Sequence, residues 1–150
     1  MEKLKGRSGP DLSTAEDLSL AVMNLISLEE HFFFTASKTG EPGYFDFSAM
    51  VREIRKQAMK DLVPEHEGET WCATKHLLAG AMRLIEVGNK LYSEKKNDEA
   101  EKNFKLAYQV YSIFWALRLK LISVKEVARD SGGKWSMEDL VNKLANCCEE

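Results

Sequence analysis

The fold class is decided by residues 13–37, which read STAEDLSLAVMNLISLEEHFFFTAS. Ser13 followed by Glu16 has the form of a capping box, in which a hydroxyl and a carboxylate satisfy amides at a helix start. Apolar residues then recur at three- and four-residue steps, the period of one helical face. These predicted core positions are Leu18, Ala21, Val22, Leu25, Leu28 and Phe32. The stretch therefore predicts a long helix over about residues 14–37.

This helix carries more apolar side chains than one core-facing stripe can hold. Phe32, Phe33 and Phe34 are consecutive, and three consecutive positions span about 200° of a helix circumference. A helix this apolar is either central in a bundle or covered by a second subunit. We therefore predict that Phe32, Phe33 and Phe34 form an interface and that the protein is a homodimer.

The helical period continues to the end of the chain, with breaks that mark turns. Further helices are predicted over about 47–62 with Asp46 as the cap, over 69–93, and from Asn97 onward. Glycine, proline and asparagine punctuate the connections. Two short helices are predicted after residue 123, and no segment alternates as a strand does. The sequence thus predicts an all-α bundle of about four long helices with one or two short C-terminal helices. Residues 1–12 are expected to be a flexible tail and residues 13–150 one domain.

Composition and charge narrow the class of protein. The chain has 150 residues, of which 44% are hydrophobic and 30% charged, with a formal net charge of −3. This balance makes nucleic-acid binding unlikely, because such proteins usually carry a strong basic excess. No apolar run approaches the roughly 18–20 residues that cross a bilayer, and residues 1–10 lack the apolar core of a secretory signal. Three cysteines at positions 72, 147 and 148 do not form a disulfide framework, so a cytoplasmic location is expected.

One segment has a recognisable pattern. Gly88, Ala100, Phe104 and Ala107 fall at intervals of 12, 4 and 3, and residues 81–114 resemble a single tetratricopeptide-repeat hairpin. The resemblance implies a tightly packed pair of antiparallel helices, because glycine and alanine allow close approach while phenylalanine fills the seam. No second copy occurs at a period of 34 residues, so a repeat-type peptide groove does not follow.

Two groups of residues are candidate ligand sites. Cys72 and His76 are four residues apart on one helical face, and His66 precedes them, which gives a thiolate and imidazole set suited to zinc. The alternative to a metal site is that all three residues are solvated or lie at the edge of the core. Arg118 lies within an apolar stripe, and a buried arginine must be paired. Glu29 or Glu30 is the predicted partner in a structural ion pair; the alternatives are recognition of an anionic ligand and a side chain that extends to solvent.

No catalytic motif appears. The sequence lacks a phosphate-binding glycine loop, a Gly-x-Ser-x-Gly elbow and a His-Glu-x-x-His pair, and no cofactor is assigned. We therefore predict a homodimeric helical interaction protein that presents helix faces to a protein partner. The alternative is a small-ligand- or metal-binding bundle, with possible enzymatic activity, built on Arg118 or on Cys72, His76 and His66.

Overall fold

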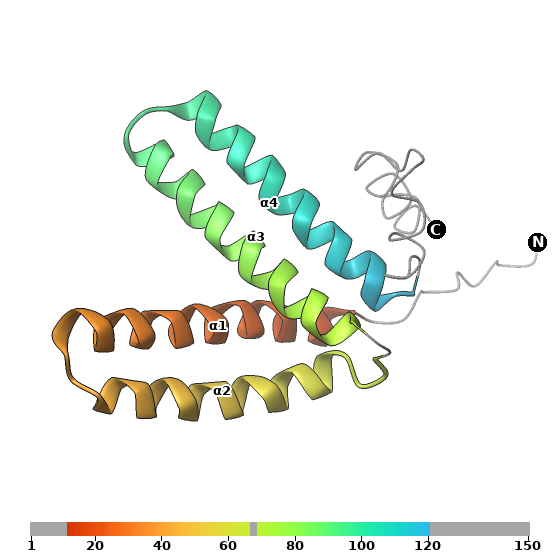
Figure 1. The fold of residues 1–150 in the computed structure, drawn as a ribbon. Helices are drawn as coiled ribbons and strands as arrows, with labels where there is room; N and C mark the ends of the chain where they lie inside the picture. The colour runs from red at the N-terminus through yellow and green to blue at the C-terminus, as the bar shows by residue number, and fades with distance from the viewer. Residues whose placement is uncertain (1–11, 67–68, 121–150) are drawn as a thin grey trace, which may run out of the picture.

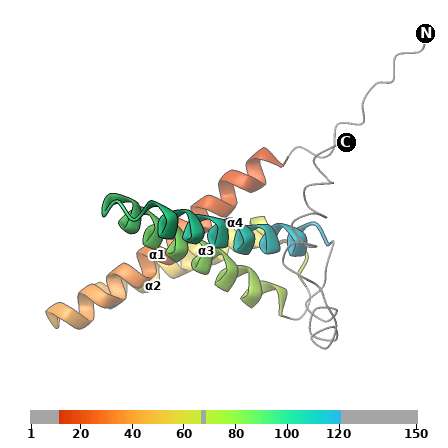
Figure 2. The same cartoon turned by 90° about the horizontal axis from the view of Figure 1, so that it is seen from above.

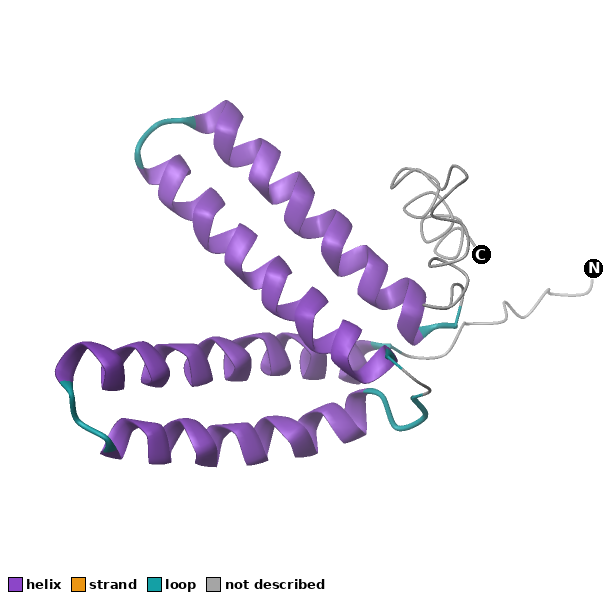
Figure 3. Ribbon diagram, in the orientation of Figure 1, coloured by secondary structure: helices purple, strands orange, loops and turns teal. Residues whose placement is uncertain are grey.

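Four helices make up the regular structure of the residues that the structure describes. The computed structural model describes residues 12–66 and 69–120, and its helices are α1 Ser13–Thr39, α2 Gly43–Leu62, α3 Thr70–Ser93 and α4 Asn97–Arg118 (Figure 1). Helix is the only regular structure in these two ranges (Figure 3). The prediction of an all-α fold with four long helices is confirmed. The short helices predicted after residue 123 and nearly all of the N-terminal tail lie outside the described residues.

The helices pack as two antiparallel hairpins. α1 lies along α2, α3 lies along α4, and the second hairpin meets the first mainly where α3 lies against α1. Figures 1 and 2 show that the hairpins cross, converge near the start of α1 and diverge toward their two turns. None of these four helices combines the length and the hydropathy of a bilayer-spanning segment.

The turn between α1 and α2 is shorter than the sequence predicts. Gly40 adopts a φ of +72°, and its N–H donates to the Ala36 carbonyl at 2.9 Å, which ends α1. A left-handed residue after the last helical turn is a common stop signal and favours glycine. Pro42 then precedes α2 directly with a φ of −66°, an angle that suits a helix start. The prediction of Asp46 as the cap was therefore wrong, because α2 already begins at Gly43.

The core lies at the convergent end, where all four helices contribute. Its buried residues are Val22, Met23, Ile26, Met59, Leu62, Val63, Leu78, Ala81 and Phe114. Ser19, which is also fully buried, lies with its Oγ 2.7 Å from the Tyr111 hydroxyl and so links α1 to α4. Polar atoms in a core need such partners, because an unpaired one loses its bonds to water.

The predicted core stripe of α1 was wrong in part. Ser19, Met23 and Ala36 are buried together with Val22 and Ile26, whereas Leu28 is 38% exposed and Ala21 is exposed. α1 is apolar on two sides, and its hydrophobic period does not reveal which side the second hairpin covers.

The seam between α3 and α4 depends on the absence of a side chain at position 88. A Cβ added to Gly88 would lie 2.4 Å from Cε1 and 2.6 Å from Cδ1 of Phe104. Ala81, Ala100 and Ala107 are buried along the same hairpin. Small residues therefore allow α3 and α4 to approach closely, and the Phe104 ring fills the space above Gly88.

The replacement of Gly88 by alanine is expected to lower the free energy of unfolding by about 1–3 kcal/mol, because the new methyl group overpacks the seam against Phe104. This sign is informative, since alanine is otherwise favoured over glycine in a helix by up to about 1 kcal/mol. Urea unfolding followed by circular dichroism measures the change.

Gly80 on the same helix is the matched control. A Cβ there would lie 3.9 Å from Cγ1 of Val110, an ordinary contact distance. Gly80→Ala is therefore expected to raise the free energy of unfolding by about 0.5–1 kcal/mol. Stabilisation by both substitutions would show that Gly88 is not required for the seam.

Candidate interaction surface

The distal part of the α1–α2 hairpin carries two aromatic clusters. The Phe32 ring lies 6.2 Å from that of Tyr44 and 5.6 Å from that of Phe47. The Phe33 ring lies 5.3 Å from Phe34 and 6.2 Å from Phe45. Consecutive helical positions point about 100° apart, so Phe32 and Phe33 join different clusters. The predicted interface of three phenylalanines is thus divided between two surfaces.

The first cluster continues along α2 as an exposed apolar stripe. Phe47, Met50 and Ile54 are 53%, 62% and 56% exposed. Their spacing of i, i+3 and i+7 places them on one side of α2. Leu25, Leu28 and Phe32 have the same spacing and form a matching stripe on α1.

The two stripes lie side by side. Phe32 contacts Phe47, and since the helices are antiparallel, Leu28 and Leu25 fall beside Met50 and Ile54 further along the hairpin. We call these six residues the α1–α2 apolar face. None of the six belongs to the buried core or packs against it. The described part of the chain therefore leaves this face without a covering element.

The register that aligns the two stripes is fixed by a buried ion pair. Arg55 Nε donates to Glu29 Oε1 at 3.0 Å and Arg55 Nη2 to Glu29 Oε2 at 3.4 Å, with side chains only 6% and 14% exposed. Ser48 Oγ also donates to the Glu29 carbonyl at 3.2 Å. A bidentate guanidinium–carboxylate pair has a narrow geometry. Glu29 and Arg55 therefore hold α1 and α2 at one relative height.

The pairing predicted for Arg118 was wrong. Glu29 is bound by Arg55, and Glu30 faces Arg83, whose Nε lies 3.7 Å from Glu30 Oε2. Arg118 ends α4, where it lines a pocket of about 80 Å³ with Val63, Thr70 and other residues near the α2–α3 connection. Its buried Nε has no hydrogen-bond partner in the described ranges.

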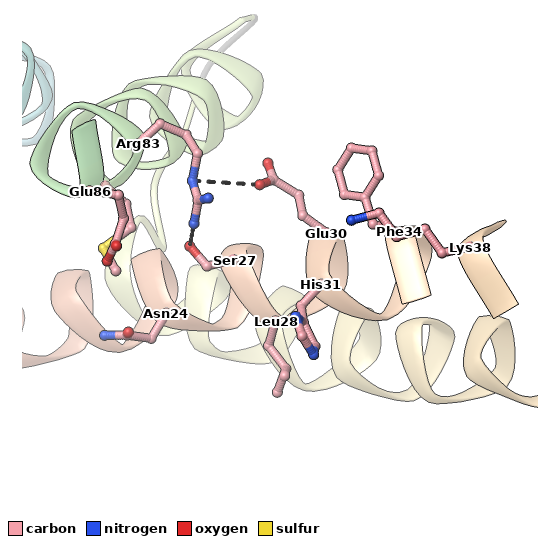
Figure 4. Close-up of a pocket in the computed structure, with 10 residues that line it drawn as sticks. Asn24, Ser27, Leu28, Glu30, His31, Phe34, Lys38, Arg83 and Glu86 are labelled. Atoms are coloured by element: carbon pink, nitrogen blue, oxygen red, sulfur yellow. Dashed lines mark hydrogen bonds and ion pairs between the residues drawn. The ribbon is translucent and has the colours of Figure 1, made fainter. Parts of the chain in front are cut away.

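A groove separates α1 from α3 where the hairpins begin to diverge (Figure 4). It encloses about 490 Å³ and is lined from α1 by Leu28, Glu30, His31 and Phe34 and from α3 by Met82, Arg83 and Glu86, among others. Arg83 crosses it, because its Nη2 donates to Ser27 Oγ at 3.0 Å. The Arg83 and Glu30 side chains are about half exposed, and ion pairs this exposed stabilise a fold only slightly.

The residues proposed as zinc ligands lie at the start of α3 and in the loop before it. Cys72, His76 and His66 are all exposed. The His66 ring contacts Trp71 with centroids 5.0 Å apart, and its Nδ1 lies 3.1 Å from the Val63 carbonyl oxygen. Within residues 12–66 and 69–120, no three His, Cys, Asp or Glu side chains converge as a metal site would require.

Known proteins offer no guide to these surfaces. No family model matches the chain. No curated protein or solved structure shows significant similarity to it either. The function therefore has to be argued from the molecule's own surfaces.

The sequence predicted an exposed apolar surface at Phe32, Phe33 and Phe34, of which Phe33 and Phe34 are 51% and 54% exposed, but it did not predict the stripe on α2. The helical period marks Met50 and Ile54 only as apolar positions of a helix over about 47–62, and nothing local marks Arg55 as the partner of Glu29. The available signal was that α2 carries two apolar stripes. One stripe, with Val51, Met59 and Leu62, includes Arg55 and is buried; the other, with Met50 and Ile54, is exposed.

Proposed function

We propose that this protein is a helical interaction module that forms a homodimer through the α1–α2 apolar face. The observation that carries the proposal is the pair of aligned stripes on α1 and α2, of which Leu28, Phe47, Met50 and Ile54 are 38–62% exposed and none packs against the buried core. Soluble monomers seldom expose contiguous apolar patches beyond a few hundred Å². A second copy would remove this surface from water. We also propose a cytoplasmic location, which fits the free, exposed thiol of Cys72.

The size of the face suits a dimer. An aromatic side chain offers about 150–250 Å², so at that size the 38–62% exposures of Leu28, Phe47, Met50 and Ile54 leave roughly 300–500 Å² of apolar surface on these four residues. A stable interface buries about 800 Å² per partner, and homodimer interfaces are about 65% apolar. The apolar face therefore has about the apolar area that such an interface requires.

The substitution Met50→Glu tests the proposal. Met50 is the most exposed residue of the face at 62%, so the change is expected to leave the fold intact. In a dimer it would place an unpaired carboxylate in an apolar contact, and the dissociation constant is expected to rise at least tenfold, about 1.4 kcal/mol. Sedimentation equilibrium over a range of concentrations measures this constant.

Tyr92→Glu is the matched control, because Tyr92 is 59% exposed on α3 in the other hairpin. It is expected to leave the dissociation constant unchanged. A monomeric wild-type protein at high concentration would overturn the proposal. An equal effect of both substitutions would remove the α1–α2 apolar face as the contact.

A further inference from the structure

We propose that the pocket around Arg118 binds phosphate, either free or as the phosphate group of a small molecule. This surface is separate from the α1–α2 apolar face, so the proposal does not depend on the dimer. Arg118 ends α4, which lies beside the α2–α3 connection (Figure 1). The pocket there encloses about 80 Å³, and Val63, Pro64 and Leu117 form its apolar walls.

The Arg118 guanidinium lacks a partner within residues 12–66 and 69–120. Its Nε is buried without a hydrogen bond, and none of the ion pairs in these two ranges includes it. Burial removes the water that would otherwise bond to Nε, and a guanidinium cannot lose its proton to compensate. Such an unsatisfied donor in a folded protein often marks the place of an ion. An anion in the pocket would balance the charge that this part of the chain leaves unpaired.

Two further positive features line the same pocket. One is Lys120, two residues beyond Arg118, and the other is the start of α3 at Thr70. The side chain of the preceding residue, Glu69, makes no capping hydrogen bond. The first amides of a helix have no partner inside it, and together they carry about half a positive charge. Amides in this position commonly bind phosphate.

One carboxylate also lines the pocket. Glu65 Oε2 accepts a hydrogen bond from Lys120 Nζ at 3.1 Å, and the two side chains are 83% and 73% exposed. An ion pair this exposed is weak, so Lys120 can exchange Glu65 for a bound anion. With Arg118 and the start of α3 included, positive charge remains in excess.

The charge and the size of the pocket fit a phosphate group. A phosphate ester carries about −1.5 to −2 charges at pH 7 and three acceptor oxygens, enough for the guanidinium, the ammonium and the α3 amides together. A carboxylate has two oxygens and one charge. A cavity of about 10–15 Å³ already holds one water molecule, so this pocket has room for a group of several atoms. Pockets that enclose drug-sized ligands have about 300–1,000 Å³, so the rest of a larger ligand would lie outside.

Titration of the full chain with inorganic phosphate, at constant ionic strength and followed by amide NMR, tests the proposal. Saturable shifts are expected at the amides of Thr70, Trp71 and Cys72, which begin α3. A parallel titration with phenyl phosphate distinguishes the two sources: binding at least as tight as that of phosphate indicates the group of a larger molecule, and weaker binding indicates the free ion. Acetate is expected to bind more weakly than either, and acetate binding as tight as phosphate would overturn phosphate as the ligand.

The substitution Arg118→Met is expected to raise the dissociation constant for phosphate at least about tenfold, because a hydrogen bond to a charged group is lost. Arg52→Met is the matched control, since Arg52 is exposed on α2 and the same charge is removed away from the pocket. It is expected to leave the dissociation constant unchanged. An equal loss in both variants would show general attraction to positive charge and overturn the site.

Glu65→Gln gives a result of opposite sign. It removes the competing carboxylate and frees Lys120, so the dissociation constant is expected to fall about two- to fivefold, and Lys120→Gln is expected to raise it by a similar factor. Both residues are exposed, so these variants remain informative even if Arg118→Met does not fold. Weaker binding in Glu65→Gln, or no saturable shift in the wild type with either phosphate compound, would overturn the proposal.

Discussion

The substitution Glu29→Leu is expected to lower the free energy of unfolding by about 3 kcal/mol. It leaves the Arg55 guanidinium, 5% exposed, without its carboxylate, and the remaining interaction is a 3.5 Å contact with the sulfur of Met59. A guanidinium cannot shed its proton to escape this environment. Removal of one partner from a buried ion pair typically costs about 3–5 kcal/mol. Urea unfolding at fixed protein concentration measures the loss.

A double-mutant cycle shows whether the loss comes from the pair. Arg55→Met together with Glu29→Leu leaves no buried charge, and the double variant is expected to recover to within about 1 kcal/mol of the wild type. Glu30→Leu is the neighbouring control, since its contact with Arg83 is exposed, and it is expected to change stability by less than about 0.5 kcal/mol. Additive losses in the double variant would contradict this account of the Glu29–Arg55 ion pair.

The cycle also bears on the dimer. If the ion pair fixes the register of α1 against α2, the double variant is expected to fold but to dimerise less tightly, because the two halves of the apolar face are no longer held in line.

The second large effect is expected at Phe114. Its side chain is fully buried in the cluster that receives residues from all four helices, and its ring lies 5.1 Å from that of Trp115 and 6.0 Å from that of Tyr111. Phe114→Ala removes these contacts and leaves a cavity where the hairpins converge, so a loss of about 3–5 kcal/mol in the free energy of unfolding is expected. Thermal and urea unfolding both report it.

Tyr108→Ala on the same helix is the control. Tyr108 is 66% exposed, and truncation there is expected to cost less than about 0.5 kcal/mol. A Phe114→Ala variant that unfolds within 1 kcal/mol of the wild type would mean that the convergent end is not the main core. Because the total stability of a domain is about 5–15 kcal/mol, the expected loss is a large part of it.

The sequence was sufficient to predict the helices themselves. Apolar residues at three- and four-residue steps predicted all four, and the bounds of α3 and α4 agree closely with those expected. The resemblance of residues 81–114 to a tetratricopeptide-repeat hairpin implied a close approach between those two helices, and the distances from Gly88 to Phe104 agree with it. These features depend on residues near one another in the chain, for which local periodicity and glycine geometry suffice.

The sequence was not sufficient to predict which charged residues form ion pairs with each other. Arg118 interrupts an apolar stripe in the sequence, yet Arg55 makes the buried ion pair. Both arginines sit among apolar neighbours at helical spacing, and the sequence does not say which one a carboxylate of α1 reaches. That depends on the register of α1 against α2, which is established only when the two helices come together.

The sequence by itself determined that residues 12–66 and 69–120 form four helices joined by short connections, and that α1 carries more apolar surface than one core-facing stripe holds. Tertiary structure decided which side of each helix is covered. Ser19, Met23 and Ile26 are buried because the second hairpin crosses α1 there, while Leu28, Met50 and Ile54 are left outside. Periodicity measures how wide an apolar face is, but burial requires another element to reach it, and that depends on contacts between residues far apart in the chain.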